Sequence, residues 1–88
     1  MGTELYVNVD EDVSRVKLRL DTQTDVMNFV SRAVSCPPEM TLHIIDDQGM
    51  RINARSLLGV LYAQEFKHMW LVSNDSKIHE IFKEFTRD

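Results

Sequence analysis

Cysteine, proline and glycine are scarce in this 88-residue sequence, which has one, two and three of them respectively. Since Cys36 has no second cysteine to pair with, we expect no intramolecular disulfide, which fits a reducing compartment. No stretch approaches the roughly 18 apolar residues that a membrane span needs. The first residues have neither a basic start nor a long apolar run, so we expect no signal peptide. These absences predict a cytoplasmic, soluble protein without membrane contact.

The sequence also has no excess of basic residues. Fourteen acidic residues against ten lysines and arginines give a formal net charge of −4. Proteins that bind nucleic acid use clustered Lys and Arg side chains to neutralise phosphates. We therefore do not expect nucleic acid as a direct partner. Arg15, Lys17 and Arg19 form one small basic row within this acidic background.

Recognisable catalytic and metal-binding patterns are absent as well. The histidines His43, His68 and His79 lack the paired spacing of a metal site. No catalytic carboxylate pair, glycine-rich phosphate loop or Ser-His-Asp pattern stands at a recognisable spacing. We therefore predict that the protein is not an enzyme and holds no metal or cofactor. Cys36, which precedes two prolines, is interpreted as a thiol at a helix end.

Strand and helix patterns alternate along the chain. Residues 15–20 alternate between charged and apolar side chains, which predicts a strand that buries Val16, Leu18 and Leu20. The next segment predicts a helix. Its apolar positions, at i, i+3, i+4 and i+7, are Val26, Phe29, Val30 and Ala33.

The start and end of this helix are marked by side chains that suit them. Thr22 and Asp25 resemble a capping box, and Thr24 is an alternative N-cap. The residue before a proline is disfavoured in the α-helical region, so the helix should end near Cys36.

The later segments follow the same logic. Strands are predicted over residues 40–45, 50–54 and 67–73, the first two as an antiparallel hairpin. A short helix is predicted over residues 56–63, and a last helix carries Ile78, Ile81, Phe82 and Phe85 at helical spacing. The aromatic side chains of Trp70, Phe82 and Phe85 are expected in the core.

The resulting order is β-α-β-β-α-β-α, which predicts an α+β fold. We expect an open-faced two-layer sandwich, with a four-stranded antiparallel sheet covered on one face by three helices. Residues 15–88 form the predicted domain. Residues 1–14 form an N-terminal extension, either disordered or an extra strand that pairs with a sheet edge and makes a dimer.

The short helix begins at a serine and contains a glycine. Ser56 is a favourable N-cap, because its hydroxyl can accept a hydrogen bond from a first-turn N–H. Gly59 costs about 1 kcal/mol relative to alanine inside a helix. We therefore expect a close neighbour at Gly59, either a strand of the same chain or a partner.

The segment Arg55-Ser56-Leu57-Leu58-Gly59-Val60-Leu61 resembles the regulatory-serine segment of HPr from Gram-positive bacteria. HPr is the small phosphocarrier of the bacterial sugar phosphotransferase system, and the predicted element order is that of the same family. The resemblance covers residues 15–86. In HPr a histidine before the first helix, in a His-x-Arg-Pro pattern, carries the phosphoryl group. The corresponding positions here hold Thr22, Thr24 and Asp25.

These departures remove the phosphoryl-carrying chemistry of the family. A threonine hydroxyl is a weak nucleophile without an activating base, and Asp25 adds negative charge where a phosphate would approach. The resemblance therefore implies a regulatory or binding protein, like HPr paralogues that lack the histidine but keep the serine. In those, a kinase phosphorylates the serine, and the phosphoserine form binds a transcriptional regulator of carbon catabolism.

By this resemblance, Ser56 is the phosphorylated residue, and an HPr kinase-like enzyme, a transcriptional regulator or phosphotransferase components are the partners. Arg55 is expected to meet the phosphate, and three leucines are expected to form an apolar patch for the partner. These leucines are Leu57, Leu58 and Leu61. Two alternatives stay open: a phosphocarrier that uses a displaced histidine, and an HPr-fold protein with an unrelated binding role.

Overall fold

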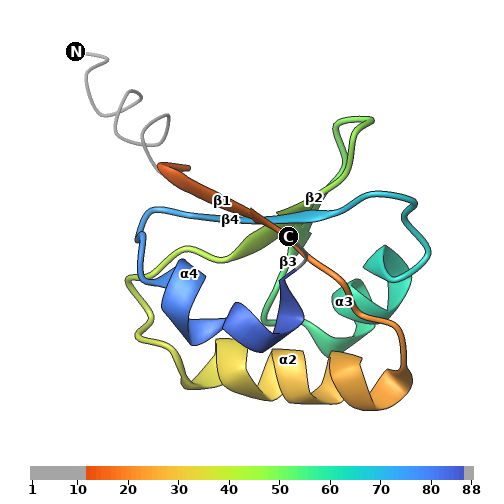
Figure 1. Cartoon of the computed structure of the whole chain (residues 1–88), viewed down its shortest axis with the longest axis horizontal. Helices are drawn as coiled ribbons and strands as arrows, with labels where there is room; N and C mark the ends of the chain where they lie inside the picture. Colours follow the sequence, from red (N-terminus) through yellow and green to blue (C-terminus); the bar gives the residue numbers. More distant parts are fainter. Residues whose placement is uncertain (1–11, 87–88) are drawn as a thin grey trace.

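Four short strands form one antiparallel sheet in the order β1-β4-β2-β3 (Figure 1). The computed structural model describes residues 12–86. The strands are β1 (Ser14–Lys17), β2 (His43–Ile45), β3 (Arg51–Asn53) and β4 (Trp70–Ser73). Ser14, which was predicted to lie in the N-terminal extension, is thus the first residue of β1, and residues 1–11 of that extension lie outside the described residues.

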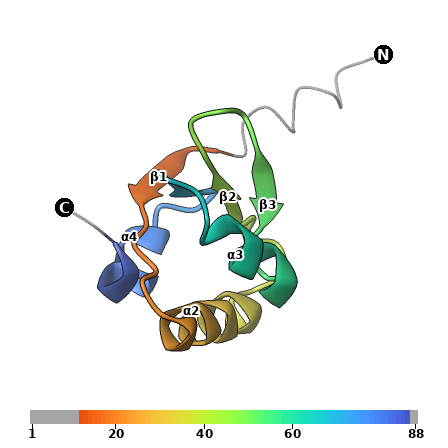
Figure 2. The same ribbon diagram turned by 90° about the vertical axis from the view of Figure 1, so that its right-hand side faces the viewer.

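Three α-helices cover one face of this sheet, which confirms the predicted open-faced α+β sandwich (Figure 1). The helices are α2 (Gln23–Ser35), α3 (Leu57–Ala63) and α4 (Ile78–Ile81), the last followed by a 3-10 turn, η2 (Lys83–Phe85). Helix α2 is the longest, and α3 and α4 lie on opposite sides of it (Figure 2). Within residues 12–86, none of the helices is long and apolar enough to cross a bilayer.

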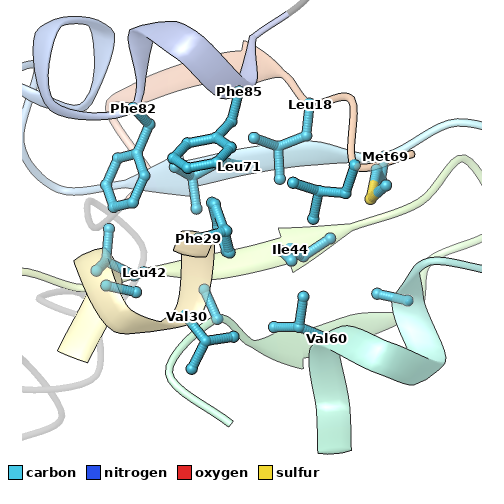
Figure 3. Packing of buried hydrophobic residues seen from close by; sticks show 14 of the residues in the cluster. Leu18, Phe29, Val30, Leu42, Ile44, Val60, Met69, Leu71, Phe82 and Phe85 are labelled. Atoms are coloured by element: carbon cyan, nitrogen blue, oxygen red, sulfur yellow. The ribbon is translucent and has the colours of Figure 1, made fainter. Parts of the chain in front are cut away.

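The core lies between the sheet and the helices, and Phe29 of α2 is near its centre (Figure 3). The Phe29 ring centroid lies 5.1 Å from that of Phe82 and 5.6 Å from that of Phe85, the latter pair edge to face. Aromatic pairs at such distances stabilise a core beyond the area they bury. The predicted burial of Phe82, Phe85 and the α2 stripe is confirmed.

Trp70, by contrast, was wrongly expected in the core. It lies in β4 opposite Ile45 and Lys17, outside the main buried cluster, whereas the next residue, Leu71, is fully buried beneath the helices. Successive side chains of a strand point to opposite faces. Trp70 therefore projects from the open face of the sheet.

The last helix was predicted to be continuous, but the structure interrupts it at Phe82 (φ −108°, ψ 23°). The Nη1 atom of Arg32 donates a hydrogen bond to the carbonyl of Ile81 at 2.9 Å. The N–H of Phe85 donates to the carbonyl of Phe82 rather than to that of Ile81. Because an arginine from α2 satisfies the Ile81 carbonyl, the chain tightens there into a 3-10 turn.

The predicted hairpin between β2 and β3 is confirmed. Asp46 organises its turn, since Oδ1 accepts hydrogen bonds from the N–H of Gln48 (2.9 Å) and of Met50 (2.8 Å). Gly49 has a φ of 91°, a conformation that residues with a Cβ rarely adopt. The turn therefore depends on both the carboxylate and the glycine.

Candidate functional site

Ser56 lies at the N-cap of α3, as its sequence context predicts. Its Oγ accepts a hydrogen bond from the N–H of Gly59 at 3.1 Å, and its backbone is extended. The side chain is half-buried. The oxygen that a kinase would modify is therefore also the oxygen that caps the helix.

Gly59 allows α3 to lie against strand β3. A Cβ placed on Gly59 would come within 2.8 Å of Cγ2 of Ile52 in β3 and within 3.2 Å of Oγ of Ser56. Carbon atoms cannot approach this closely without displacing one another. Of the two neighbours expected at Gly59, the structure thus shows a strand of the same chain.

The guanidinium group of Arg55 is directed to the end of α2. Nε donates to the carbonyl of Ala33 at 3.1 Å, Nη1 to that of Met40 at 2.9 Å, and Nη2 to that of Pro37 at 2.7 Å. A longer contact of 3.4 Å joins Nη2 to the carbonyl of Cys36. A cation at a helix C-terminus meets carbonyls that have no partner within the helix. Arg55 therefore joins α2 to α3, and its expected contact with a phosphate or partner stays a prediction.

The leucines after Ser56 differ in their exposure. Leu58 is 80% exposed and Leu57 is 44% exposed, whereas Leu61 is half-buried and packs against the core. Tyr62, one turn after Leu58, is 53% exposed. The outer surface of α3 is therefore largely apolar.

Helix α2 extends this apolar surface. Met27 and Val34 are both exposed, and each lies roughly 200° around the helix from Arg32. Arg32 binds Glu84 on the α4 side of the molecule, so Met27 and Val34 lie on the flank that faces α3. We call this surface the α2–α3 patch; it comprises Met27, Val34, Leu57, Leu58, Leu61 and Tyr62.

Thr22, at the position that corresponds to the phosphoryl-carrying histidine of HPr, is a helix cap. Its Oγ1 accepts the N–H of Asp25 at 3.0 Å, and its own N–H donates to Oδ2 of Asp25 at 3.1 Å. This reciprocal pair is the predicted capping box. Hydrogen bonds from the backbone N–H of Asp21 and of Thr22 hold the pKa of Asp25 below its ordinary value.

Thr22 and Ser56 lie toward opposite ends of α2. Thr22 caps its N-terminus, whereas Arg55, the neighbour of Ser56, contacts its C-terminus. A helix of 13 residues is about 20 Å long. The structure therefore does not bring the two positions together.

The three histidines lie on different elements, and Cys36 lies beside Arg55 at the end of α2. His43 is in β2, His68 precedes β4 and His79 is exposed in α4. Within residues 12–86 no three His, Cys, Asp or Glu side chains are grouped so that they could hold a metal ion. Cys36 is half-buried at the end of α2, and burial raises the pKa of its thiol.

The sequence patterns did not predict one cluster of side chains, which lies on the open face of the sheet. Cζ of Arg15 and Nζ of Lys17 lie 4.6 and 4.9 Å from the centre of the Trp70 ring system. The basic row of residues 15–19 was a signal for it. Its aromatic member could not be placed, because residues 69–72 are all apolar and hide the alternation of β4.

Comparison with protein-family models, with curated proteins and with solved structures finds no match to this chain. The resemblance to HPr thus rests on the Ser56 segment and on the order of the elements.

Proposed function

We propose that this protein is a cytoplasmic HPr-like regulatory protein, without phosphocarrier activity, whose binding to a partner is controlled by phosphorylation of Ser56. The observation that carries the proposal is that Ser56 stands directly before Leu57 and the 80% exposed Leu58. A phosphoryl group adds a charge of about −1.5 to −2 at pH 7. On Ser56 it would convert one end of an apolar surface into an anionic one.

The α2–α3 patch is the proposed partner surface. Exposed apolar side chains from two packed helices are typical of protein-binding sites when they are grouped. Arg55 joins the start of α3 to the end of α2, and Val60 and Ala63 of α3 are buried in the core, whereas Leu57 and Leu58 are exposed. A partner can therefore bind the patch without disturbing the joint between the helices. The proposed partners are an HPr kinase-like enzyme and a transcriptional regulator of carbon catabolism.

The role of Thr22 as a cap supports the absence of carrier chemistry. A phosphoryl group on its Oγ1 would displace the hydrogen bond from Asp25 and would place a dianion beside the Asp25 carboxylate. The side chain that contacts this hydroxyl is Asp25, and its lowered pKa makes the carboxylate a weak base for activating a nucleophile. Thr22 is therefore assigned to helix capping.

The test is phosphorylation of the full chain by HPr kinase and ATP, read by intact mass. We expect the mass of one phosphoryl group to be added, and the addition to be lost in Ser56→Asn. Asparagine is a good N-cap, so this variant keeps the fold while removing the acceptor hydroxyl. Ser31→Ala, at an exposed position of α2, is the matched control and should still be modified.

A second incubation, with phosphoenolpyruvate and the general phosphotransferase enzyme, tests carrier activity. We expect no acid-labile phosphohistidine in this arm. No modification in the kinase arm, or modification that persists in Ser56→Asn, would refute the proposal and favour an unrelated binding role. Modification in the phosphoenolpyruvate arm would favour a phosphocarrier that uses a displaced histidine.

A further inference from the structure

A group of basic side chains surrounds Trp70 at one end of the open face. Arg15 and Lys17 of β1 both lie over the Trp70 ring, and the ring of His68 stacks against it with centroids 6.3 Å apart. Such cation–π contacts hold the long basic side chains in place. The basic side chains are thus held close together around Trp70 on the surface.

Lys17 and His68 are also in direct contact. Nζ of Lys17 lies 3.1 Å from Nδ1 of His68. A lysine ammonium can only donate hydrogen bonds, so Nδ1 is the acceptor. The proton of the neutral imidazole is then on Nε2, which remains able to donate to another group.

A surface depression of about 300 Å³ opens beside this contact. It is lined by Lys17, Leu18, Lys67 and His68. Lys67 and His68 are exposed, and they reach the depression from the segment before β4. Two ammonium groups and one imidazole therefore converge on a space large enough for one small anionic group.

Within the part of the chain that the structure describes, no carboxylate forms an ion pair with the basic side chains at this spot. None of the ion pairs formed within residues 12–86 involves Arg15, Lys17 or Lys67. Two other arginines are paired: Arg19 with Asp21 at 2.9 Å, and Arg51, on the other edge strand of the sheet, with Asp12 at 3.0 Å. The chain as a whole has a net charge of −4. The excess of positive charge is therefore confined to this small part of the surface.

We propose that the depression lined by Lys17, Lys67 and His68 binds the phosphate group of a phosphate monoester. A dianion with several acceptor oxygens matches two ammonium donors and an imidazole N–H. An extended polyanion fits less well, because Arg19, the next basic residue after Lys17, is already paired with Asp21. This site is independent of Ser56 and of the function proposed for it.

The monoester can come from a small metabolite or from a phosphorylated protein side chain. The test is a ¹H–¹⁵N NMR titration of the full chain at constant ionic strength with two probes, glycerol 2-phosphate and a short phosphoserine peptide. We expect saturable shifts at the amides of Leu18, Lys67 and His68 with at least one probe. The tighter probe identifies the source, and sodium chloride at matched ionic strength should not reproduce the shifts.

Two lysine variants give the matched comparison. Lys67→Gln should weaken binding roughly tenfold, since it removes one charge-assisted hydrogen bond. Lys77→Gln, an exposed lysine outside this depression, makes the same change in net charge and should leave binding unchanged. The proposal would be overturned if the two variants had equal effects or if the shifts did not saturate. Tighter binding of a single-stranded oligonucleotide than of either monoester would also overturn it.

Discussion

Nη2 of Arg55 lies 2.7 Å from the carbonyl oxygen of Pro37, just beyond the C-terminal end of α2. The same guanidinium reaches the carbonyls of Ala33 and Met40. The residue directly before Ser56 therefore satisfies the end of another helix. Whatever binds at the start of α3 acts next to a joint on which the packing of α2 depends.

Arg55→Ala should lower the free energy of unfolding by about 3 kcal/mol. Hydrogen bonds to a charged group each contribute about 1.5–3 kcal/mol. The truncation removes all of them, although the carbonyls of Ala33 and Pro37 keep a backbone N–H donor. Arg55→Lys should cost roughly half as much, because an ammonium group cannot reproduce the planar fork. Urea denaturation measures both.

Arg19→Ala is the control for this comparison. Arg19 makes one exposed ion pair with Asp21, and such pairs contribute roughly 0–1 kcal/mol. If Arg55→Ala were no more destabilising than Arg19→Ala, the joint between the helices would not depend on the guanidinium.

Gly59→Ala should destabilise the fold by about 1 kcal/mol, although alanine is the better helix former. The gain in helix propensity is about 1 kcal/mol, but the added methyl group meets Cγ2 of Ile52 at 2.8 Å. Overpacking of this kind costs about 1–3 kcal/mol. A double-mutant cycle with Ile52→Ala isolates the contact, and in that background Gly59→Ala should become stabilising. The same cost in both backgrounds would place the strain elsewhere.

The stability should fall in acid partly through Asp25. The pKa of its carboxyl is lowered in the folded protein, so the carboxylate stabilises the fold above the unfolded pKa, and this contribution disappears as the pH falls through the lowered value. Asp25→Asn should therefore flatten the dependence of stability on pH below about pH 4. Urea denaturation across that range is the measurement. An unchanged dependence on pH in Asp25→Asn would show that the capping box does not contribute to the loss of stability in acid.

Trp70 should be quenched more strongly by iodide than by caesium. It is the one tryptophan of the sequence, and Arg15 and Lys17 lie over its ring, so anions are concentrated near it and cations are repelled. We expect a ratio of quenching constants of about two or more at low salt. Replacing Arg15 and Lys17 by glutamine should remove the preference.

The control for the quenching experiment replaces two lysines outside this cluster, Lys77 and Lys83, by glutamine. This variant has the same net charge as the first one but keeps both cations over Trp70. It should retain the preference for iodide. Equal loss in the two variants would show that the overall charge, rather than the local pair, directs the quencher.

Local patterns were sufficient to predict most of the fold. The capping box of Thr22 and Asp25, the N-cap of Ser56 and the stripe of α2 all depend on residues within one or two helical turns. The interruption of the last helix was not predictable in this way. It depends on Arg32, which lies 49 residues before the carbonyl of Ile81 to which it donates.

The candidate site was predictable to a smaller extent. Ser56 and the exposure of Leu57 and Leu58 follow from a capped amphipathic helix, and both are seen. The position of Arg55 does not follow, because its acceptors lie 15 to 22 residues away in the chain. Contacts at such separations are set by tertiary packing, which a single sequence does not display.

The strand order determines which parts of the sheet can fold first during synthesis. Within residues 12–86, strand β1 has β4 as its one neighbour in the sheet, and Lys17 contacts a histidine 51 residues further along the chain. During synthesis the hairpin of β2 and β3 can form early, whereas β1 stays without its neighbour until β4 has left the ribosome. Closing so large a loop is entropically costly, and topologies rich in distant contacts fold more slowly than local ones. The docking of β1 onto β4 is thus expected to be among the last steps of folding during synthesis.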